Sequence, residues 1–124
     1  MTYRMINGWT KERMSSTIAK RVPEGGAVSA GCCQYRLDAD EPKSQCCSAG
    51  AFIPDDIWPD LVVVEPVGTW DDLVRDNPEA GLEKVAPLEV AGMLEMQHVH
   101  DKLALRGGPA RDGVLAWIFV EVEE

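Results

Sequence analysis

All the cysteines of this chain lie in two adjacent pairs, and such pairs restrict how the surrounding segment can fold. The pairs are Cys32-Cys33 and Cys46-Cys47, in the stretch AGCCQYRLDADEPKSQCCSAG. Neighbouring side chains in an extended strand point to opposite faces, so one pair cannot direct both sulfurs at the same ion. Four interpretations must therefore be compared: disulfides, metal ligands, a catalytic nucleophile and small buried side chains.

The N-terminal sequence MTYRMINGWTKER has no apolar stretch of the kind that a secretory signal requires. We therefore expect the chain to remain in the cytoplasm, a reducing compartment in which structural disulfides are rare. The longest apolar run, residues 114–120, has 7 residues, too few to cross a membrane. The sequence thus predicts neither disulfides nor a membrane partner.

Length and charge restrict the class of protein. A chain of 124 residues, 45% of them hydrophobic, is expected to form one domain over residues 1–124. Its net charge of −9 is uneven, because residues 1–37 carry six Lys/Arg against two Asp/Glu and residues 38–124 carry six against nineteen. Such an acidic body repels phosphate backbones, so we expect no direct nucleic-acid binding. The charge either solvates the surface or docks onto a basic patch of another protein.

The apolar periodicity and the positions of Gly and Pro predict an α+β fold. An N-terminal helix is expected to follow Thr10, a suitable N-cap, and to end before Pro23. Residues 27–37 and 44–53 are expected to form a small β-hairpin, because Asp, Pro and charged residues between them are typical of a turn. A long C-terminal helix is predicted over about residues 87–105, closed by Gly-Gly-Pro.

Two further segments are less regular in pattern. Residues 54–72 contain three prolines and two tryptophans and are predicted to be an irregular acidic segment, with a short helix starting after Thr69. The apolar tail, residues 112–124, suits a strand and a buried helix equally well. Trp117 and Phe119 are large side chains to leave exposed, so the tail is also a candidate homodimer contact.

A zinc site is one interpretation of the Cys and His residues. On a helix His98 and His100 diverge, so these two side chains cannot hold one metal together. His100 is expected about 40° from the centre of the apolar stripe of its helix. The ligand set that remains is Cys33, Cys47 and His100. The alternative is that the thiols are small buried side chains.

Nucleophilic catalysis would need a thiolate, a base and a group that orients the base. Cys33 or Cys47, with His100 and Asp101, are residues of these types. Asp101 follows His100 directly, so on a helix its side chain should point about 100° away and should not orient the imidazole. No sequence feature indicates an oxyanion hole. Enzymatic activity is the less favoured interpretation, with Cys47 and His100 as its catalytic residues.

The acidic segment supplies a candidate partner-binding surface. Its carboxylates are not accompanied by a Gly-rich loop that would hold a phosphate, so magnesium–phosphate chemistry is not indicated. Its tryptophans are either core residues or anchors of a protein interface. The residues expected to bind a partner are Asp55, Asp56, Trp58, Asp60, Glu65, Trp70, Asp71 and Asp72.

Three short motifs occur along the chain, each of them once. Residues 33–36 read CQYR, residues 47–56 read CSAGAFIPDD and residues 96–101 read MQHVHD. Together they resemble a family of small bacteriophage and prophage proteins with the patterns C-x-Y-R, K-C-x-x-G-x-x-I-P-D-[DE] and L-Q-x-[IV]-H-D. The resemblance covers about residues 7–101, including the opening NGWTKERM. Cys32 and Cys46 are additions to the family pattern, and Met96 replaces its Leu.

The resemblance implies a small α+β domain of phage or prophage origin, and it brings no established activity. It singles out Cys33, Cys47, His100 and Asp101 as a set. We expect an accessory protein that acts without catalysis by binding a host protein with a basic patch. The expected subclass is an inhibitor of a defence or nucleic-acid-processing factor. The alternatives are a structural zinc module on Cys33, Cys47 and His100, and a small Cys/His enzyme.

Overall fold

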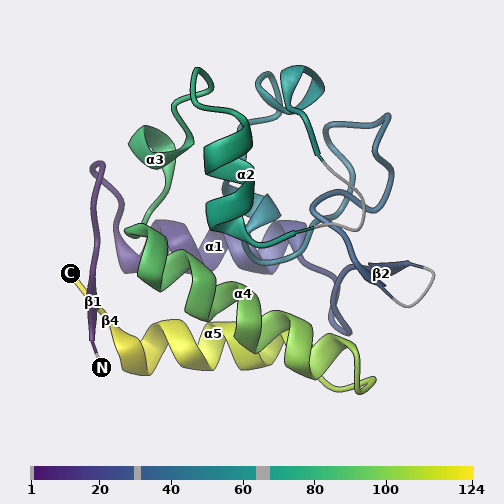
Figure 1. Ribbon diagram of the computed structural model, residues 1–124. Coiled ribbons are helices and arrows are strands. Elements are labelled where there is room, and N and C mark those ends of the chain that lie inside the picture. Colours follow the sequence, from purple (N-terminus) through teal and green to yellow (C-terminus); the bar gives the residue numbers. More distant parts are fainter. Residues whose placement is uncertain (1, 30–31, 64–67) are drawn as a thin grey trace.

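The computed structural model describes residues 2–29, 32–63 and 68–124 and confirms the α+β class (Figure 1). Five α-helices and two short 3-10 helices within these ranges account for most of the regular structure, and the strands are very short. In chain order the elements are β1 (Tyr3–Arg4), α1 (Lys11–Arg21), β2 (Val28–Ser29), β3 (Cys32–Cys33), η1 (Gly50–Phe52), η2 (Trp58–Asp60), α2 (Trp70–Asp76), α3 (Leu82–Val85), α4 (Val90–Ala104), α5 (Ala110–Glu121) and β4 (Val122–Glu123).

Helix α1 forms where the sequence predicts it. The Thr10 hydroxyl accepts a hydrogen bond from the Arg13 N–H at 3.1 Å, which satisfies one of the free N–H groups of the first turn. Met14 and Ile18, four residues apart, are fully buried. The helix therefore turns an apolar stripe to the core and leaves its basic side chains at the surface.

The tail forms a helix, which resolves the ambiguity of its sequence. In α5, Val114 and Ile118 are fully buried one turn apart, whereas Phe119 is 79% exposed. Trp117 packs against the ring of Tyr3, with ring centroids 5.7 Å apart. Helices α4 and α5 lie side by side, and α1 packs against α5 (Figure 1). A homodimer contact through Trp117 and Phe119 stays a prediction.

His100 lies at the centre of the buried face of α4, not at its edge. Met93, Met96 and His100 are each fully buried, and Ala104 continues the same stripe. Val99 and Leu103 of the same helix are apolar but only partly buried, so the buried face is centred on His100 and not to one side of it. The histidine is thus an interior residue, and its polar atoms need partners inside the protein.

The predicted hairpin is wrong in its pairing. The antiparallel pair is β2 with β3, in which Val28 lies opposite Cys33. Residues 44–53, expected to be the second strand, form turns and η1. They still lie beside the first segment, because the Cys47 N–H donates to the Gln34 carbonyl at 3.1 Å.

A parallel pair of strands joins the two ends of the described chain. Tyr3 in β1 pairs with Val122 in β4, and the Met5 N–H donates to the Glu123 carbonyl at 3.1 Å. Strands of two residues are too short to produce an alternating sequence pattern, so this pair was not predicted. The first and last segments consequently lie next to each other (Figure 1).

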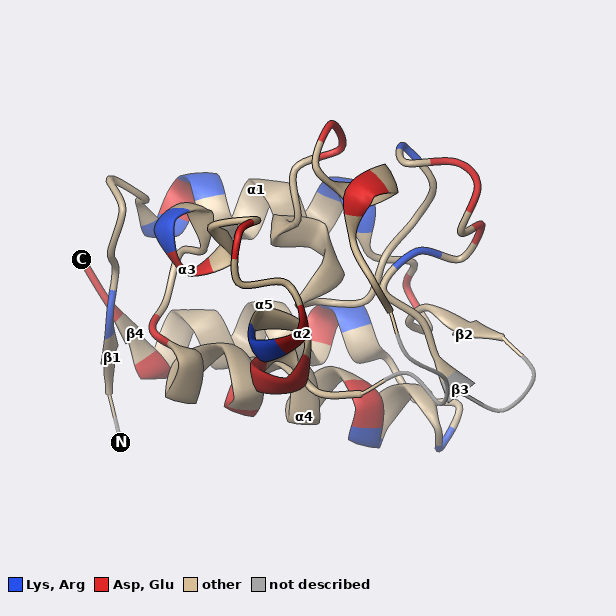
Figure 2. Ribbon diagram, turned by 45° about the horizontal axis from the view of Figure 1, so that its top comes forward, with Lys and Arg blue, Asp and Glu red and all other residues tan. Residues whose placement is uncertain are grey.

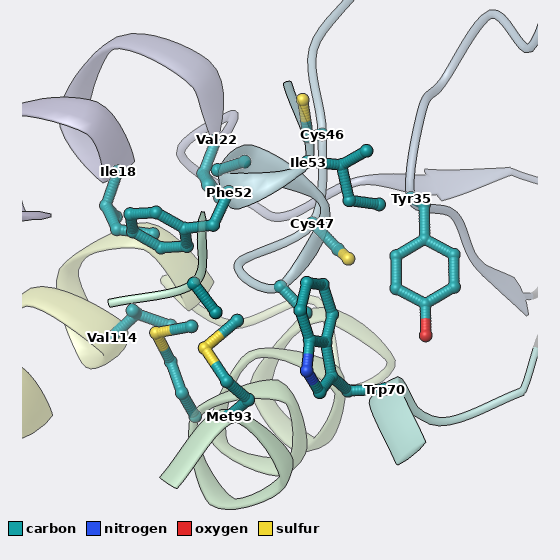
Figure 3. Packing of buried hydrophobic residues seen from close by; sticks show 14 of the residues in the cluster. Ile18, Val22, Tyr35, Cys46, Cys47, Phe52, Ile53, Trp70, Met93 and Val114 are labelled. Carbon is teal, nitrogen blue, oxygen red and sulfur yellow. The ribbon is translucent and has the colours of Figure 1, made fainter. Parts of the chain in front are cut away.

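The core gathers residues from every part of the chain (Figure 3). Trp70 is fully buried, next to Cys47 and Tyr35 (Figure 3). No helix within the described ranges has the length and apolar character that a membrane span requires.

Candidate functional site

A buried arginine organises the segment that carries two of the three motifs. The side chain of Arg36 has no exposed surface, and its guanidinium donates to backbone carbonyls of three residues further along the chain. These acceptors are Pro42 at 2.8 Å, Ile53 at 2.6 Å and Gly50. Buried charge is costly unless it is fully hydrogen-bonded, so this network fixes the loop around Arg36.

Asp55 is the counter-ion of this network and not a free surface carboxylate. One of its oxygens lies 2.9 Å from Arg21 and 3.3 Å from Arg36. Its charge is already shared by two guanidinium groups, and the expectation that Asp55 also binds a partner stays a prediction. The C-x-Y-R and I-P-D motifs meet in this contact, which gives both a structural purpose.

The second cysteine pair lies inside the protein. Cys46 and Cys47 are buried, and their sulfurs point away from each other (Figure 3). Burial raises the pKa of the Cys47 thiol, and a hydrogen bond at 3.3 Å from the Gly50 N–H opposes this only in part. Burial likewise raises the pKa of Cys46 in spite of the neighbouring Arg36. Cys47 is thus a neutral thiol without access to substrate, which does not fit the catalytic role considered for it.

His100 is held by hydrogen bonds at both ring nitrogens. Nε2 lies 3.1 Å from the Ala27 N–H, which donates to it, and Nδ1 lies 2.8 Å from a carboxylate oxygen of Asp101. Because Nε2 accepts, the proton of the neutral ring is on Nδ1 and is donated to Asp101. Gly26, at φ +90°, sets the direction of the Ala27 N–H, and a Cβ there would meet Ala104 at 2.5 Å.

The expectation that Asp101 cannot orient His100 is wrong. The angle of 100° between neighbours on a helix describes the directions of the Cβ atoms, and not where the ends of the side chains lie. The Asp101 carboxylate reaches back along the helix to the imidazole. It is the residue that selects the ring tautomer.

Cys33 completes a group of three metal-ligand types. One potential ligand atom each from Cys33, His100 and Asp101 lies within 4.8 Å of the others. Cys33 is half-buried, so this group lies at the edge of the core. Cys47 of the predicted ligand set is not a member of the group, whose third residue is Asp101.

The hydrogen bonds of His100 restrict what this group can bind. An ion at Nδ1 would require the ring proton to move to Nε2, where it would face the Ala27 N–H. An ion at Nε2 would displace the Ala27 N–H, a buried donor that costs about 1–3 kcal/mol when it is unpaired. The geometry therefore fits a hydrogen-bonded core histidine more closely than a preformed metal site.

The acidic region contains a groove of about 580 Å3. It lies between η2 and the residues around the end of α2, and we call it the acidic groove. Its lining combines four exposed carboxylates with apolar side chains. The lining residues are Asp56, Ile57, Asp60, Leu61, Asp76, Asn77, Pro78, Glu79 and Ala80.

Asn77 holds the two sides of the acidic groove together. Its side chain accepts from the Val62 N–H at 2.7 Å and donates to the carbonyls of Val62 and Leu73, both at 2.9 Å. Asn77 is only 9% exposed, so these bonds are largely shielded from water. The groove is consequently a fixed shape and not a gap between mobile loops.

The remaining predicted partner-binding residues do not form one surface, because some line the acidic groove and others are buried in the core. Asp56 and Asp60 line the acidic groove. Trp70 and Trp58 are 0% and 8% exposed and belong to the core, which corrects the expectation that they contact a partner. Glu65 lies outside the described residues.

Asp71 and Asp72 are in the first turn of α2 and do not line the acidic groove. Figure 2 shows acidic residues on this helix. The Thr69 hydroxyl donates to both carboxylates, and its bond to Asp71 lowers the pKa of that carboxyl. Asp72 also pairs with Arg75 at 3.1 Å. These two residues thus stabilise the start of the helix.

The sequence did not indicate two of the groove carboxylates as partner-binding residues. Asp76 is the last residue of α2, and Glu79 lies three residues beyond it, after Asn77-Pro78. The Asn77-Pro78 sequence was the available signal, because it predicts the end of a helix. A chain that turns back at this point brings the residues before and after the turn close together.

Comparisons with known proteins do not place the chain in a group. No family model matches it, and searches of the curated proteins and of the solved structures find no match.

Proposed function

We propose that this protein acts without catalysis, by holding a basic segment of a partner protein in the acidic groove. The observation that carries the proposal is the composition of the groove. Asp56, Asp60, Asp76 and Glu79 line it, and no Lys or Arg of the described chain does. A cationic side chain entering it would gain charge–charge attraction from several sides.

The apolar part of the lining supports a peptide-like occupant over a bare ion. Ile57, Leu61 and Ala80 are half-buried and line the acidic groove together with the exposed carboxylates. Lys and Arg carry an aliphatic stem and a charged head, so they match a lining that is both apolar and acidic. A volume of about 580 Å3 admits a side chain together with a short piece of backbone.

The resemblance to phage proteins extends the proposal to a class of partner. The partner would be a host protein, and a defence or nucleic-acid-processing factor is the class we propose. Such factors present Lys- and Arg-rich surfaces to phosphate backbones. An acidic protein docked on that surface would compete with the nucleic acid and inhibit the factor.

A pull-down from host lysate at low and at high salt tests the proposal. We expect a partner to be retained at low salt and released at high salt, because exposed charges are screened beyond about 8 Å at physiological ionic strength. The variant Asp60→Asn/Glu79→Gln should lose this partner. The control Asp40→Asn/Asp112→Asn removes the same charge elsewhere and should keep it. Equal retention by both variants would leave the groove without a role.

Binding of a peptide of known sequence distinguishes a specific role of the acidic groove from a general effect of the negative charge of the chain. A short Arg/Leu peptide should bind the unmodified chain and the control variant, and bind the groove variant at least about fivefold more weakly. The corresponding Glu/Leu peptide should not bind. Binding of magnesium or calcium with the same dependence on Asp60 and Glu79 would instead identify the groove as a cation site.

A metal site at Cys33, His100 and Asp101 is the second candidate function, because their ligand atoms converge within 4.8 Å. It predicts stoichiometric zinc after purification without chelator. Cys33→Ser should then remove the zinc, and Cys47→Ala should not. Protein that is free of zinc and folds equally well with a chelator would mean that the three residues serve the fold alone.

A further inference from the structure

A second hollow, of about 470 Å3, lies between α1, the η1 turn and α3. We call it the basic pocket. It shares no lining residue with the acidic groove, and its chemistry is the opposite. The lining residues are Asn7, Trp9, Arg13, Arg21, Ala51, Phe52, Ile53, Pro54, Asp55, Lys84 and Val85.

The walls of the basic pocket are rigid and partly aromatic. The Trp9 indole N–H donates to the Val85 carbonyl at 2.9 Å, which fixes the plane of the ring. Phe52, almost completely buried, meets Trp9 edge to face with ring centroids 5.2 Å apart. A preformed apolar floor of this kind favours a planar ligand, because little ordering is required on binding.

The charges of the basic pocket do not balance. Arg13, Arg21 and Lys84 line it, with Asp55 as its one carboxylate. Asp55 is occupied by Arg21 and by Arg36 behind it. Arg13 stacks over the Trp9 ring at 4.0 Å, and within the described ranges neither it nor Lys84 has a carboxylate at ion-pair distance.

The excess of positive charge in the basic pocket is opposite in sign to the net charge of the whole chain. The chain carries a net charge of −9, yet the basic pocket has more cations than anions. Figure 2 shows the basic start of α1 close to the basic residue of α3. Like charges that line one hollow repel each other, and an anion placed between them relieves that repulsion.

We propose that the basic pocket binds a small organic anion with a planar apolar body. Its carboxylate or phosphate pairs with Arg13 and Lys84, and its planar body lies against Pro54 and Val85, which are half-buried. The Arg13 guanidinium offers paired N–H donors, which match two oxygens of either group. This inference is independent of the acidic groove and of its proposed partner.

The position of Arg21 orients the ligand. Arg13 and Arg21 are eight residues apart on one helix, which corresponds to about 12 Å at the helical rise. The Arg21 end holds Asp55, 2.9 Å from its guanidinium, so a second negative group would be repelled there. The anionic group therefore lies at the Arg13 end and the neutral body extends toward the Arg21–Asp55 pair.

Titration of the full chain with four matched probes tests the proposal. The probes are naphthyl phosphate, naphthoate, naphthol and inorganic phosphate, and the Trp9 indole N–H signal in heteronuclear NMR is the readout. We expect naphthyl phosphate or naphthoate to shift this signal saturably, and naphthol and inorganic phosphate to bind at least about tenfold more weakly. The stronger of the two anionic probes identifies the head group.

The variant Arg13→Gln/Lys84→Gln should weaken the anionic probes at least about tenfold, because it removes both head-group partners. Lys20→Gln/Lys102→Gln removes the same charge from exposed positions outside the pocket and should bind like the unmodified chain. Absence of any saturable shift up to about 1 mM, the weak end of specific binding, would overturn the proposal. Equal binding of inorganic phosphate and naphthyl phosphate would also overturn it, because the apolar floor would then contribute nothing.

Discussion

The charge in the interior around Arg36 is buried and hydrogen-bonded, whereas the charges in the two surface hollows are exposed. The Arg36 guanidinium has no exposed surface and is surrounded by backbone carbonyls and Asp55. In the acidic groove Asp76 pairs with Arg75 at 3.4 Å, whereas its other three carboxylates have no cation at ion-pair distance within the described ranges. In the basic pocket Arg13 and Lys84 likewise lack carboxylate partners in these ranges. Buried, saturated charge serves architecture, whereas exposed, unsaturated charge is available to another molecule.

The largest expected effect comes from Arg36→Met, which keeps the volume and removes the charge. The Ile53 carbonyl would lose its side-chain donor, while the Pro42 carbonyl would keep only Arg21 and the Gly50 carbonyl only the Ile53 N–H, so we expect unfolding to become easier by about 3 kcal/mol. Urea denaturation measures the change. Arg75→Met, at an arginine whose side chain is 69% exposed, should stay within about 0.5 kcal/mol. Similar values for both would remove the distinction between the two regions.

Gly50→Ala tests the backbone that surrounds Arg36. A Cβ at Gly50 would lie 2.3 Å from the Tyr35 carbonyl oxygen, closer than atoms can approach without backbone movement. We expect a loss of about 1–3 kcal/mol, at the upper end of that range. Gly25→Ala is the control, because nothing lies within 4 Å of a Cβ there. A neutral Gly50→Ala would show that the loop around Arg36 can shift.

The buried acids predict how stability depends on pH. Burial raises the pKa values of Cys46, Cys47 and Tyr35 in the folded chain. Above about pH 8.5 for the thiols and about 10 for the phenol, the unfolded chain loses protons that the folded chain keeps. These three groups should therefore leave the free energy of unfolding independent of pH below this range, and above it the free energy should fall by about 1.4 kcal/mol per pH unit for each group.

Denaturation under reducing conditions at a series of pH values checks this slope. Cys47→Ala should fall less steeply by the contribution of one group. An unchanged slope in that variant would mean that the Cys47 thiol ionises in the folded chain as it does in the unfolded chain.

The smallest effect is expected at the surface. Asp60→Asn/Glu79→Gln removes like charges from the acidic groove without breaking a hydrogen bond of the described chain, so stability should change by no more than about 0.5 kcal/mol. Thermal denaturation at low salt measures the difference. A large loss would show that these carboxylates belong to the architecture, as Asp55 does.

Local signals predicted α1, α2 and α4, whereas α3 was not predicted and the segment of α5 was left open between strand and helix. Thr10 and the spacing of Met14 and Ile18 located α1, and the Gly-Gly-Pro sequence located the end of α4. The pairing of residues 27–37 with 44–53 failed because tertiary contacts overrode strand propensity. Arg36 draws the carbonyls of Gly50 and Ile53 toward itself, and a chain bent around one side chain cannot continue a ladder.

The candidate sites were harder to predict than the elements. The family resemblance singled out Cys33, Cys47, His100 and Asp101, and the structure brings the ligand atoms of all but Cys47 together. Helical geometry at the level of the Cβ atoms missed the hydrogen bond between His100 and Asp101. Asp55 and Trp70 lie in an acidic segment whose composition is typical of a surface loop. Only the packing shows that Asp55 is a counter-ion and that the Trp70 ring belongs to the core. The basic pocket joins segments about 70 residues apart in the sequence, so no local pattern announces it.

The β1–β4 pair has a mechanical consequence. The two strands run parallel, and the chain enters at the start of one and leaves at the end of the other (Figure 1). A force applied to the two ends would therefore slide the strands along each other and load their hydrogen bonds together, where a hairpin would unzip bond by bond. The contact of Tyr3 with Trp117 lies in the same line of force. The β1–β4 pair would thus resist the applied force before the force reaches the core.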